Sequence, residues 1–182
     1  MLNQPSPRTI YIIISLVIII LAPIIVLIFP LFSVETFHFD KGQIVRIPLV
    51  ENFYLVAIAF ITLIIGVLTL AFKRNSITYI LSGVLCVMFF GLIYVSTIGY
   101  TIIHKDYIVL QNIAMSEKYE WNDISDVLYE YEVGEFGIYY FLTKDGREFS
   151  IAENGKFGRD ETREIAHIIN LKKINFEKRQ IE

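Results

Sequence analysis

The chain has 182 residues, of which 54% are hydrophobic and 19% are charged, and its formal net charge is −3. This composition is too apolar for an ordinary soluble domain of that length. The single cysteine, Cys86, excludes an intrachain disulfide and a metal site built from several cysteines.

Three uncharged runs predict transmembrane helices at about 10–32, 53–72 and 77–100, so that residues 1–100 form a membrane region. A helix rises about 1.5 Å per residue, and roughly 20 apolar residues cross a hydrocarbon core of about 30 Å. The first run is longer than the apolar part of a secretory signal, so we interpret it as a helix. Pro23 and Pro30 are expected to kink it or to end it early.

The three runs contain no Asp, Glu, Lys, Arg or His. An ionisable residue in mid-membrane usually marks an ion or proton path, so its absence argues against a pump or a proton-coupled transporter. Small residues such as Gly66, Ser82 and Gly83 predict close packing of helices within the chain, with a dimer face as the alternative. Between the first two runs, apolar residues around Asp40-Lys41-Gly42 predict a short hairpin at the membrane surface.

From position 101 onward the pattern changes, which predicts a separate domain over 101–182. Alternation of polar and apolar residues predicts half-buried strands at 107–110, 118–121, 129–133, 138–143 and 148–152. Asp145-Gly146 predicts a hairpin turn, and a helical period follows over about 160–171, with Asp160 as the expected N-cap. We expect a small antiparallel sheet of five or six strands that one C-terminal helix closes without lipid, followed by a frayed tail.

The strand at Tyr107–Leu110, the motif Trp121-x-Asp123-Ile124 and the isoleucine-rich final helix resemble the bacterial pleckstrin-homology-like (PH-like) domains that are attached to membrane helices. The resemblance covers roughly residues 100–171. It is a structural signature, in which Trp121 and Ile124 are expected in the core and Asp123 at a turn, where its side chain would bond local backbone amides. The resemblance implies a binding or scaffolding module in a family of mostly uncharacterised proteins, which includes a group of bacteriocin-immunity proteins.

The basic residues that flank the runs are equally divided between the two sides of the membrane, with Arg8, Lys73 and Arg74 on one side and Lys41, Arg46 and Lys105 on the other. The short loop with Lys73 and Arg74 would tilt the C-terminal domain outward. The resemblance implies the cytoplasmic side. We expect a multi-pass protein of the cell membrane whose C-terminal domain faces the cytoplasm.

The charge of the C-terminal domain restricts its partners. From position 100 onward, 16 Asp and Glu residues face 11 Lys and Arg residues. This excess of negative charge makes binding to anionic lipid headgroups unlikely by repulsion and argues against nucleic acid. A protein or peptide partner is therefore expected.

No catalytic pattern is recognisable, since a Ser-His-Asp order, GxSxG, HExxH and paired carboxylates in an apolar setting are all missing. Glu164 and His167 lack a second metal-binding pair, and the segment Gly155–Arg159 lacks phosphate-loop spacing. We therefore expect no enzyme, cofactor or metal site. Two functions remain open: a non-catalytic protein that presents an interaction domain, which includes a bacteriocin-immunity role, and an accessory subunit of a transporter or membrane enzyme that binds through its helices.

Overall fold

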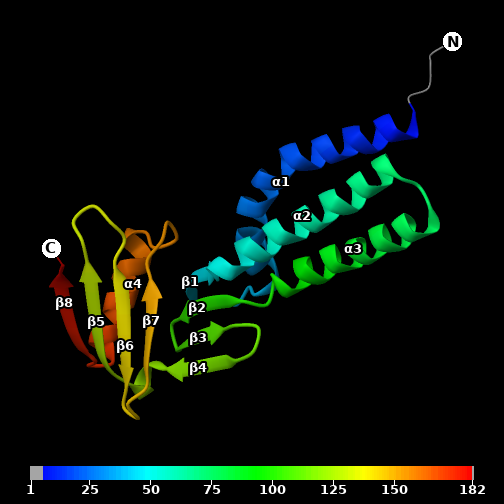
Figure 1. The fold of residues 1–182 in the computed structure, drawn as a ribbon. Coiled ribbons are helices and arrows are strands. Elements are labelled where there is room, and N and C mark those ends of the chain that lie inside the picture. The colour runs from blue at the N-terminus through cyan, green and yellow to red at the C-terminus, as the bar shows by residue number, and fades with distance from the viewer. Residues whose placement is uncertain (1–5, 182) are drawn as a thin grey trace. The chain divides into compact units, whose positions relative to one another are not determined.

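A computed structural model describes residues 6–181 (Figure 1). The chain divides into two compact units. A helical unit contains the chain up to His38 together with Pro48–Gly99. A β-rich unit contains Phe39–Ile47 and the chain from Tyr100 onward. The β-rich unit is therefore built from two stretches of sequence, and the shorter stretch comes from between the first two helices.

The helical unit consists of α1 (Pro7–Phe37), α2 (Val50–Phe72) and α3 (Ser76–Val95). In the described part of the chain, these three helices are long and apolar enough to cross a membrane. Their large aliphatic side chains are mostly exposed, and α3 has no buried residue among those described. Such a surface suits an apolar surrounding, because a helix satisfies its own backbone groups there.

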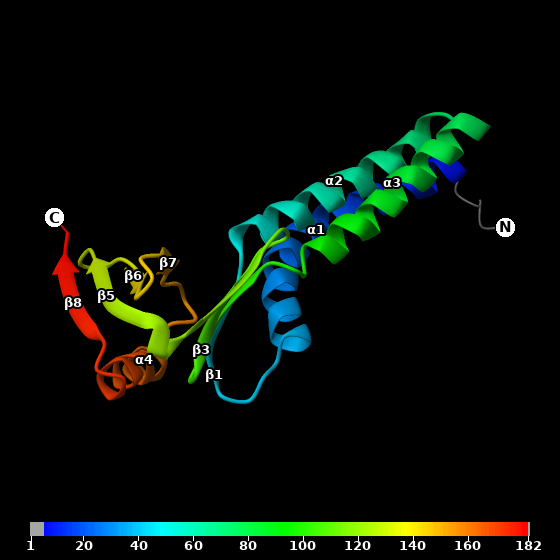
Figure 2. The same ribbon diagram turned by 90° about the horizontal axis from the view of Figure 1, so that it is seen from below.

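Two details of these helices differ from the prediction. Pro23 and Pro30 do not end α1, which continues to Phe37. Figures 1 and 2 show that α1 changes direction in its C-terminal half, as expected for a helix with internal prolines. The third helix stops at Val95 rather than near 100, because Ser96 begins a turn and Tyr100 already belongs to a strand.

The helix α2 contacts both α1 and α3. The hydroxyl of Ser82 donates a hydrogen bond of 2.9 Å to the carbonyl oxygen of Gly66 on the facing helix. A Cβ atom at Gly66 would lie 3.4 Å from Cβ of Leu85, so the small residue permits this close approach. By contrast, Gly83 and Gly91 face open space.

The expected single sheet of five or six strands is not what forms: the described residues of the β-rich unit form two four-stranded sheets and one α-helix (Figures 1 and 2). The first sheet has the order β1-β2-β3-β4, with bounds Gln43–Pro48, Tyr100–His104, Tyr107–Gln111 and Ser116–Glu120. The second has the order β7-β6-β5-β8, with bounds Glu148–Ala152, Ile138–Thr143, Ile124–Tyr131 and Asn175–Gln180. Helix α4 (Arg159–Leu171) lies between β7 and β8 in the sequence.

The prediction of a hairpin between the first two helices is wrong. Its place is taken by the single strand β1, which pairs with β2. The amide of Lys105 donates to the carbonyl of Gly42, and that of Leu49 to the carbonyl of Gly99, so the two strands run in opposite directions. Val45 is 3% exposed and belongs to the core of the β-rich unit. A hairpin of two strands on its own would have left this side chain in solvent.

The C-terminal end also differs from the prediction. The expected frayed tail is the strand β8, which pairs with β5 in parallel, so the second sheet is mixed. Asp160 does not cap α4, whose N-cap is Gly158, although Asp160 and Glu161 do lie in the first turn. The helix ends at Leu171 with Lys172 as its C-cap, and Lys173 follows with a positive φ of 56°.

Both sheets and α4 share one core. Trp121 lies in the short 3₁₀ turn between β4 and β5, where the chain passes from one sheet to the other, and its side chain is fully buried. Its indole N–H donates a hydrogen bond of 2.8 Å to the carbonyl oxygen of His104, and its ring meets Phe141 edge to face. From the helix, Ile165 and Ile169 complete this core.

Candidate interaction surface

The three residues of the predicted signature, Trp121, Asp123 and Ile124, lie in and beside the turn between β4 and β5. Trp121 and Ile124 are buried in the core, as expected. Asp123 lies in the turn, but its side chain is exposed and makes no hydrogen bond among those of residues 6–181. It is the carbonyl of Asp123 that accepts a hydrogen bond, from the amide of Lys144. These three residues thus build the passage between the sheets rather than a ligand site.

The second sheet has one covered and one open face. Side chains of a strand alternate between the two faces. On one face, Val127, Tyr139, Phe141 and Ile151 pack against α4 in the core. The residues between them therefore point away from α4, and we call this side the outer face: it presents Asp126, Leu128, Tyr140, Leu142, Glu148 and Ser150.

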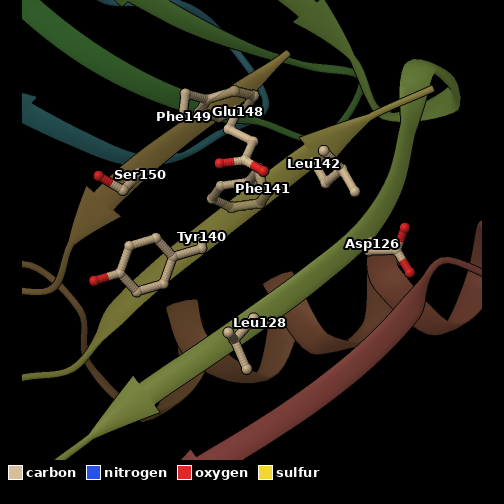
Figure 3. Close-up of a pocket in the computed structure, with 8 residues that line it drawn as sticks. All are labelled: Asp126, Leu128, Tyr140, Phe141, Leu142, Glu148, Phe149 and Ser150. Carbon is tan, nitrogen blue, oxygen red and sulfur yellow. The ribbon is translucent and has the colours of Figure 1, made fainter. Parts of the chain in front are cut away.

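A shallow hollow of about 520 Å³ lies on the outer face. Figure 3 shows the side chains that line it, with α4 on the opposite side of the sheet. The backbones of Phe141 and Phe149 form part of its floor, since the ring of Phe141 turns into the core. This volume lies within the range of about 300–1,000 Å³ that is usual for ligand sites.

The centre of the outer face is apolar. Leu128 on β5 stands directly opposite Tyr140 on β6, and Leu142 lies two residues further along β6. Tyr140 is 40% exposed, while Leu128 and Leu142 are half-buried. A phenol ring beside two aliphatic side chains gives contact area with little conformational entropy to lose, as is typical of protein-binding surfaces.

Carboxylates flank this apolar centre. Asp126 pairs with Leu142 from β5, and Glu148 pairs with it from β7. Hydrogen bonds from Asn175 and Ser125 lower the pKa of Asp126, so this group stays ionised at neutral pH. Glu148 is exposed and has no polar partner among the described residues.

Two arginines close to the outer face already have acidic partners. Arg179 on β8 pairs with Glu130 and with Glu177, each over 3.1 Å. Arg147, in the turn before β7, pairs with Asp145 and lies over the ring of Tyr119. The outer face is therefore apolar at its centre and negatively charged at its border.

A second hollow of about 490 Å³ lies beside the start of α4. There the hydroxyl of Tyr129 donates a hydrogen bond of 2.7 Å to Glu153, which also accepts one from the amide of Gly137. Burial, and next the bond to Glu153, raise the pKa of Tyr129 well above its ordinary value. The polar groups of Tyr129 and Glu153 thus bond each other and the backbone. We interpret this cluster as one that stabilises the fold.

The segment before α4 forms a loop, as expected. The side chain of Asn154 accepts a hydrogen bond from the amide of Lys156, and Gly158 begins the helix. A carboxylate oxygen of Glu161 lies 2.6 Å from the position that a Cβ atom at Gly158 would take, so an acidic group already occupies this helix end.

The histidines do not form a site. His38 and His104 each bond a backbone carbonyl, that of Thr97 and that of Lys41. The pair of Glu164 and His167 is not made, since Glu164 pairs with Lys105 over 3.0 Å. In the part of the chain from 6 to 181, no group of three or more His, Cys, Asp or Glu side chains could hold a metal ion.

The outer face could not be predicted from the sequence. Alternation predicts the strands that contain Tyr140 and Glu148, but the strand predicted at 129–133 leaves out Asp126 and Leu128 of β5, and alternation cannot say which side α4 covers. The sequence hints at this face only through Leu128 and Tyr140, which are apolar at positions where a solvated face of a sheet usually has polar residues.

No family model matches the chain, and no curated protein matches its sequence.

Proposed function

We propose that the chain is a non-catalytic, multi-pass protein of the cell membrane, and that its β-rich unit is a PH-like domain that binds another protein or peptide. The single observation that carries this proposal is the apolar hollow on the outer face, flanked by Asp126 and by the unpaired Glu148. The layout of two sheets and a C-terminal helix is compatible with the PH-like resemblance.

The membrane part of the proposal is supported by α1, α2 and α3, which are long and apolar enough to cross a bilayer. The pairing of β1 with β2 adds a constraint, because both strands must lie on the same side of the membrane. Two crossings, by α2 and then by α3, would return the chain to that side. The pairing of β1 with β2 is therefore consistent with two membrane-spanning helices between them.

The charge of the β-rich unit supports a protein partner over a lipid. Over its two stretches, 39–47 and 100–182, the sequence has 17 acidic and 13 basic residues, so an anionic headgroup would be repelled. Helices that span a membrane already anchor the chain there, and lipid binding by the domain would add little. The outer face, in contrast, offers the apolar centre that a protein interface needs.

Site-specific photo-crosslinking in the native cell tests the proposal. A photoreactive phenylalanine derivative replaces Tyr140 on the outer face, Met115 in the β3–β4 turn as a matched exposed control, or Val87 on α3. We expect an adduct from the position of Tyr140 and none from that of Met115. Absence of any adduct at position 140 contradicts the proposal.

An accessory subunit of a transporter or membrane enzyme is the second candidate. Its supporting observation is α3, which buries none of its described residues, so that the side turned away from α2 is left for another helix. In the same experiment, an adduct from Val87 without one from Tyr140 would favour this function.

We further propose that the β-rich unit faces the cytoplasm, as the resemblance implies. Cys86→Ser removes the single thiol, and Ser150→Cys then places one on the exposed outer face. A membrane-impermeant maleimide should label this thiol only after the cells are permeabilised. Labelling in intact cells would show the opposite orientation, in which an extracellular peptide becomes the more reasonable partner.

A further inference from the structure

Strand β7 is an edge of the second sheet. It pairs with β6, and no strand among residues 6–181 lies on its other side. Figure 1 shows β7 at the end of the row β8, β5, β6, β7. An unpaired edge presents a row of free N–H and C=O groups and is a template for another strand.

The register of the sheet identifies these free groups. The amide of Thr143 bonds the carbonyl of Arg147, and the amide of Glu153 bonds the carbonyl of Gly137. In an antiparallel pair, every second residue bonds the neighbouring strand. Counting in twos from Arg147 to Glu153, the backbone groups of residues 147, 149, 151 and 153 face β6. Those of Glu148, Ser150 and Ala152 therefore face the open edge.

The same three residues have exposed side chains on the outer face. A strand added along β7 would thus place every second side chain beside Glu148 and Ser150, at the border of the hollow. Glu148 has no cationic partner among the described residues, so a lysine or arginine at that position would neutralise it. The intervening side chains would turn to the side of Phe149, which is half-buried at this edge.

We infer that the open edge of β7 binds an extended, cationic segment of a partner protein as a fifth strand of the second sheet. Its lysine or arginine side chains lie against Glu148 on the outer face, and its apolar side chains alternate with them. The inference rests on the proposed function and names the chemistry of its partner. Backbone hydrogen bonds give such a complex affinity, and alternate side chains give it specificity.

A second copy of this chain is a less suitable occupant. Its β-rich unit also has more acidic than basic residues, and its own β7 would offer Glu148 rather than a cation. The acidic border of the outer face thus selects for a partner of opposite charge. Self-association at β7 is an outcome that sedimentation of the complete chain would reveal, and it would contradict the inference.

Peptide binding to the complete chain in nanodiscs of zwitterionic lipid tests the inference. The probe is a fluorescent heptapeptide in which lysine and valine alternate, and its anisotropy is read in low salt. A peptide of alternating glutamate and valine is the charge control. The lysine peptide with N-methyl groups on alternate residues, which cannot pair with a strand edge, is the backbone control. Empty nanodiscs correct for binding to lipid.

Two variants test the two parts of the recognition. Glu148→Lys reverses the charge beside the edge and should weaken binding of the lysine peptide about tenfold or more. Ser150→Pro removes a donor that faces the open edge while leaving the ladder to β6 intact, and should weaken it by about as much. Ser150→Ala keeps the backbone donor and should bind like the unchanged chain.

The lysine peptide should bind, and both control peptides should bind at least about tenfold more weakly. Equal binding of the lysine and glutamate peptides, full affinity in Ser150→Pro, or no binding of the lysine peptide would each overturn the inference. The proposed function would survive these results if the photo-crosslink at Tyr140 still formed, so the two failures can be told apart.

Discussion

The side-chain amide of Asn52 donates a hydrogen bond of 2.5 Å to the carbonyl oxygen of Gly99, and so ties the first turn of α2 to the residue before β2. The same carbonyl accepts the amide of Leu49 over 3.4 Å. Asn52 is 1% exposed, which is unusual for a side chain with two N–H donors and is explained by this bond. The contact thus joins the two ends of the segment, made of α2 and α3, that separates β1 from β2 in the sequence.

Gly99→Ala should destabilise the helical unit, because the added Cβ atom would lie 2.9 Å from Oδ1 of Asn52 and 3.0 Å from Cδ1 of Leu49. Displacing Asn52 breaks its bond, and we expect a loss of about 1–3 kcal/mol in detergent. Gly91→Ala is the matched control, since nothing lies within 4 Å of the new atom. Thermal unfolding followed by circular dichroism measures both variants, and equal melting temperatures would contradict the role of Gly99.

The β-rich unit should be markedly more stable with β1 than without it. The sequence alone suggested that residues 101–182 suffice for folding, but the core also contains Val45. Because the amide of Leu49 reaches the carbonyl of Gly99, a two-residue Asn-Gly turn can join residues 39–49 directly to residues 99–181. We expect a cooperative melt for this joined chain, and a loss of about 2–4 kcal/mol for residues 100–181 alone. Identical urea unfolding curves would show that β1 is dispensable.

Trp121→Ala should destabilise the β-rich unit by about 3–5 kcal/mol, because it leaves a cavity between the sheets. Trp121→Phe keeps most of the volume but loses the bond to the carbonyl of His104, and we expect about 1–3 kcal/mol. Circular dichroism measures both variants. In the unchanged chain, Trp121 is the single tryptophan, so its fluorescence reports unfolding of this unit specifically. A melting temperature that Trp121→Ala does not change would argue against a core position.

Lys173→Gly should stabilise the C-terminal end of the β-rich unit. Lys173 follows α4 with a φ of 56°, a backbone conformation that glycine adopts without steric strain. The amide of Ile174 bonds the carbonyl of Ile169 across this turn, so the conformation is needed. We expect a gain of about 0.5–1 kcal/mol in urea unfolding. Lys172→Gly, at a φ of −83°, is the control and should not stabilise.

The stability of the β-rich unit should fall at alkaline pH. Burial and the bond to Glu153 raise the pKa of Tyr129, and burial followed by the charge of Glu153 raises that of Tyr139. An unfolded tyrosine ionises near pH 10, so both groups contribute stability below that pH and lose it as the pH rises further. Urea unfolding between pH 8 and about 12 measures the slope. Tyr129→Phe should reduce it, and an unchanged slope would place the titration elsewhere.

Local pattern was enough to predict the helices and most strands. The uncharged runs specify α1 to α3, because length and apolarity decide whether a helix can cross a bilayer. Alternation specifies β6 and the last three residues of β5, and the period of Ile165, Ile168 and Ile169 specifies α4 within one residue of its start.

Long-range pairing could not be predicted in this way. The apolar residues of Gln43–Pro48 indicate a strand, but its partner β2 lies beyond two further helices. Asn175–Gln180 shows no alternation, because all of its residues are exposed at an edge and it pairs with β5 through its backbone and through polar side chains such as Arg179. The outer face depends on which side of the second sheet α4 covers, which is a property of the packed unit and not of any one strand.

The first sheet combines a strand that precedes α2 and α3 with strands that follow them, which has a consequence for biosynthesis. The strand β1 ends at Pro48 and leaves the ribosome before α2 and α3, whereas its partner begins at Tyr100. The nascent β1 therefore stays without its partner until α2 and α3 have been synthesised. If α2 and α3 span a bilayer, as we propose, a chain in which only one of them crosses has β1 and β2 on opposite sides, and the sheet cannot form. On that proposal, the first sheet can be completed only in a chain in which both α2 and α3 cross, and a chain inserted otherwise leaves β2 without β1.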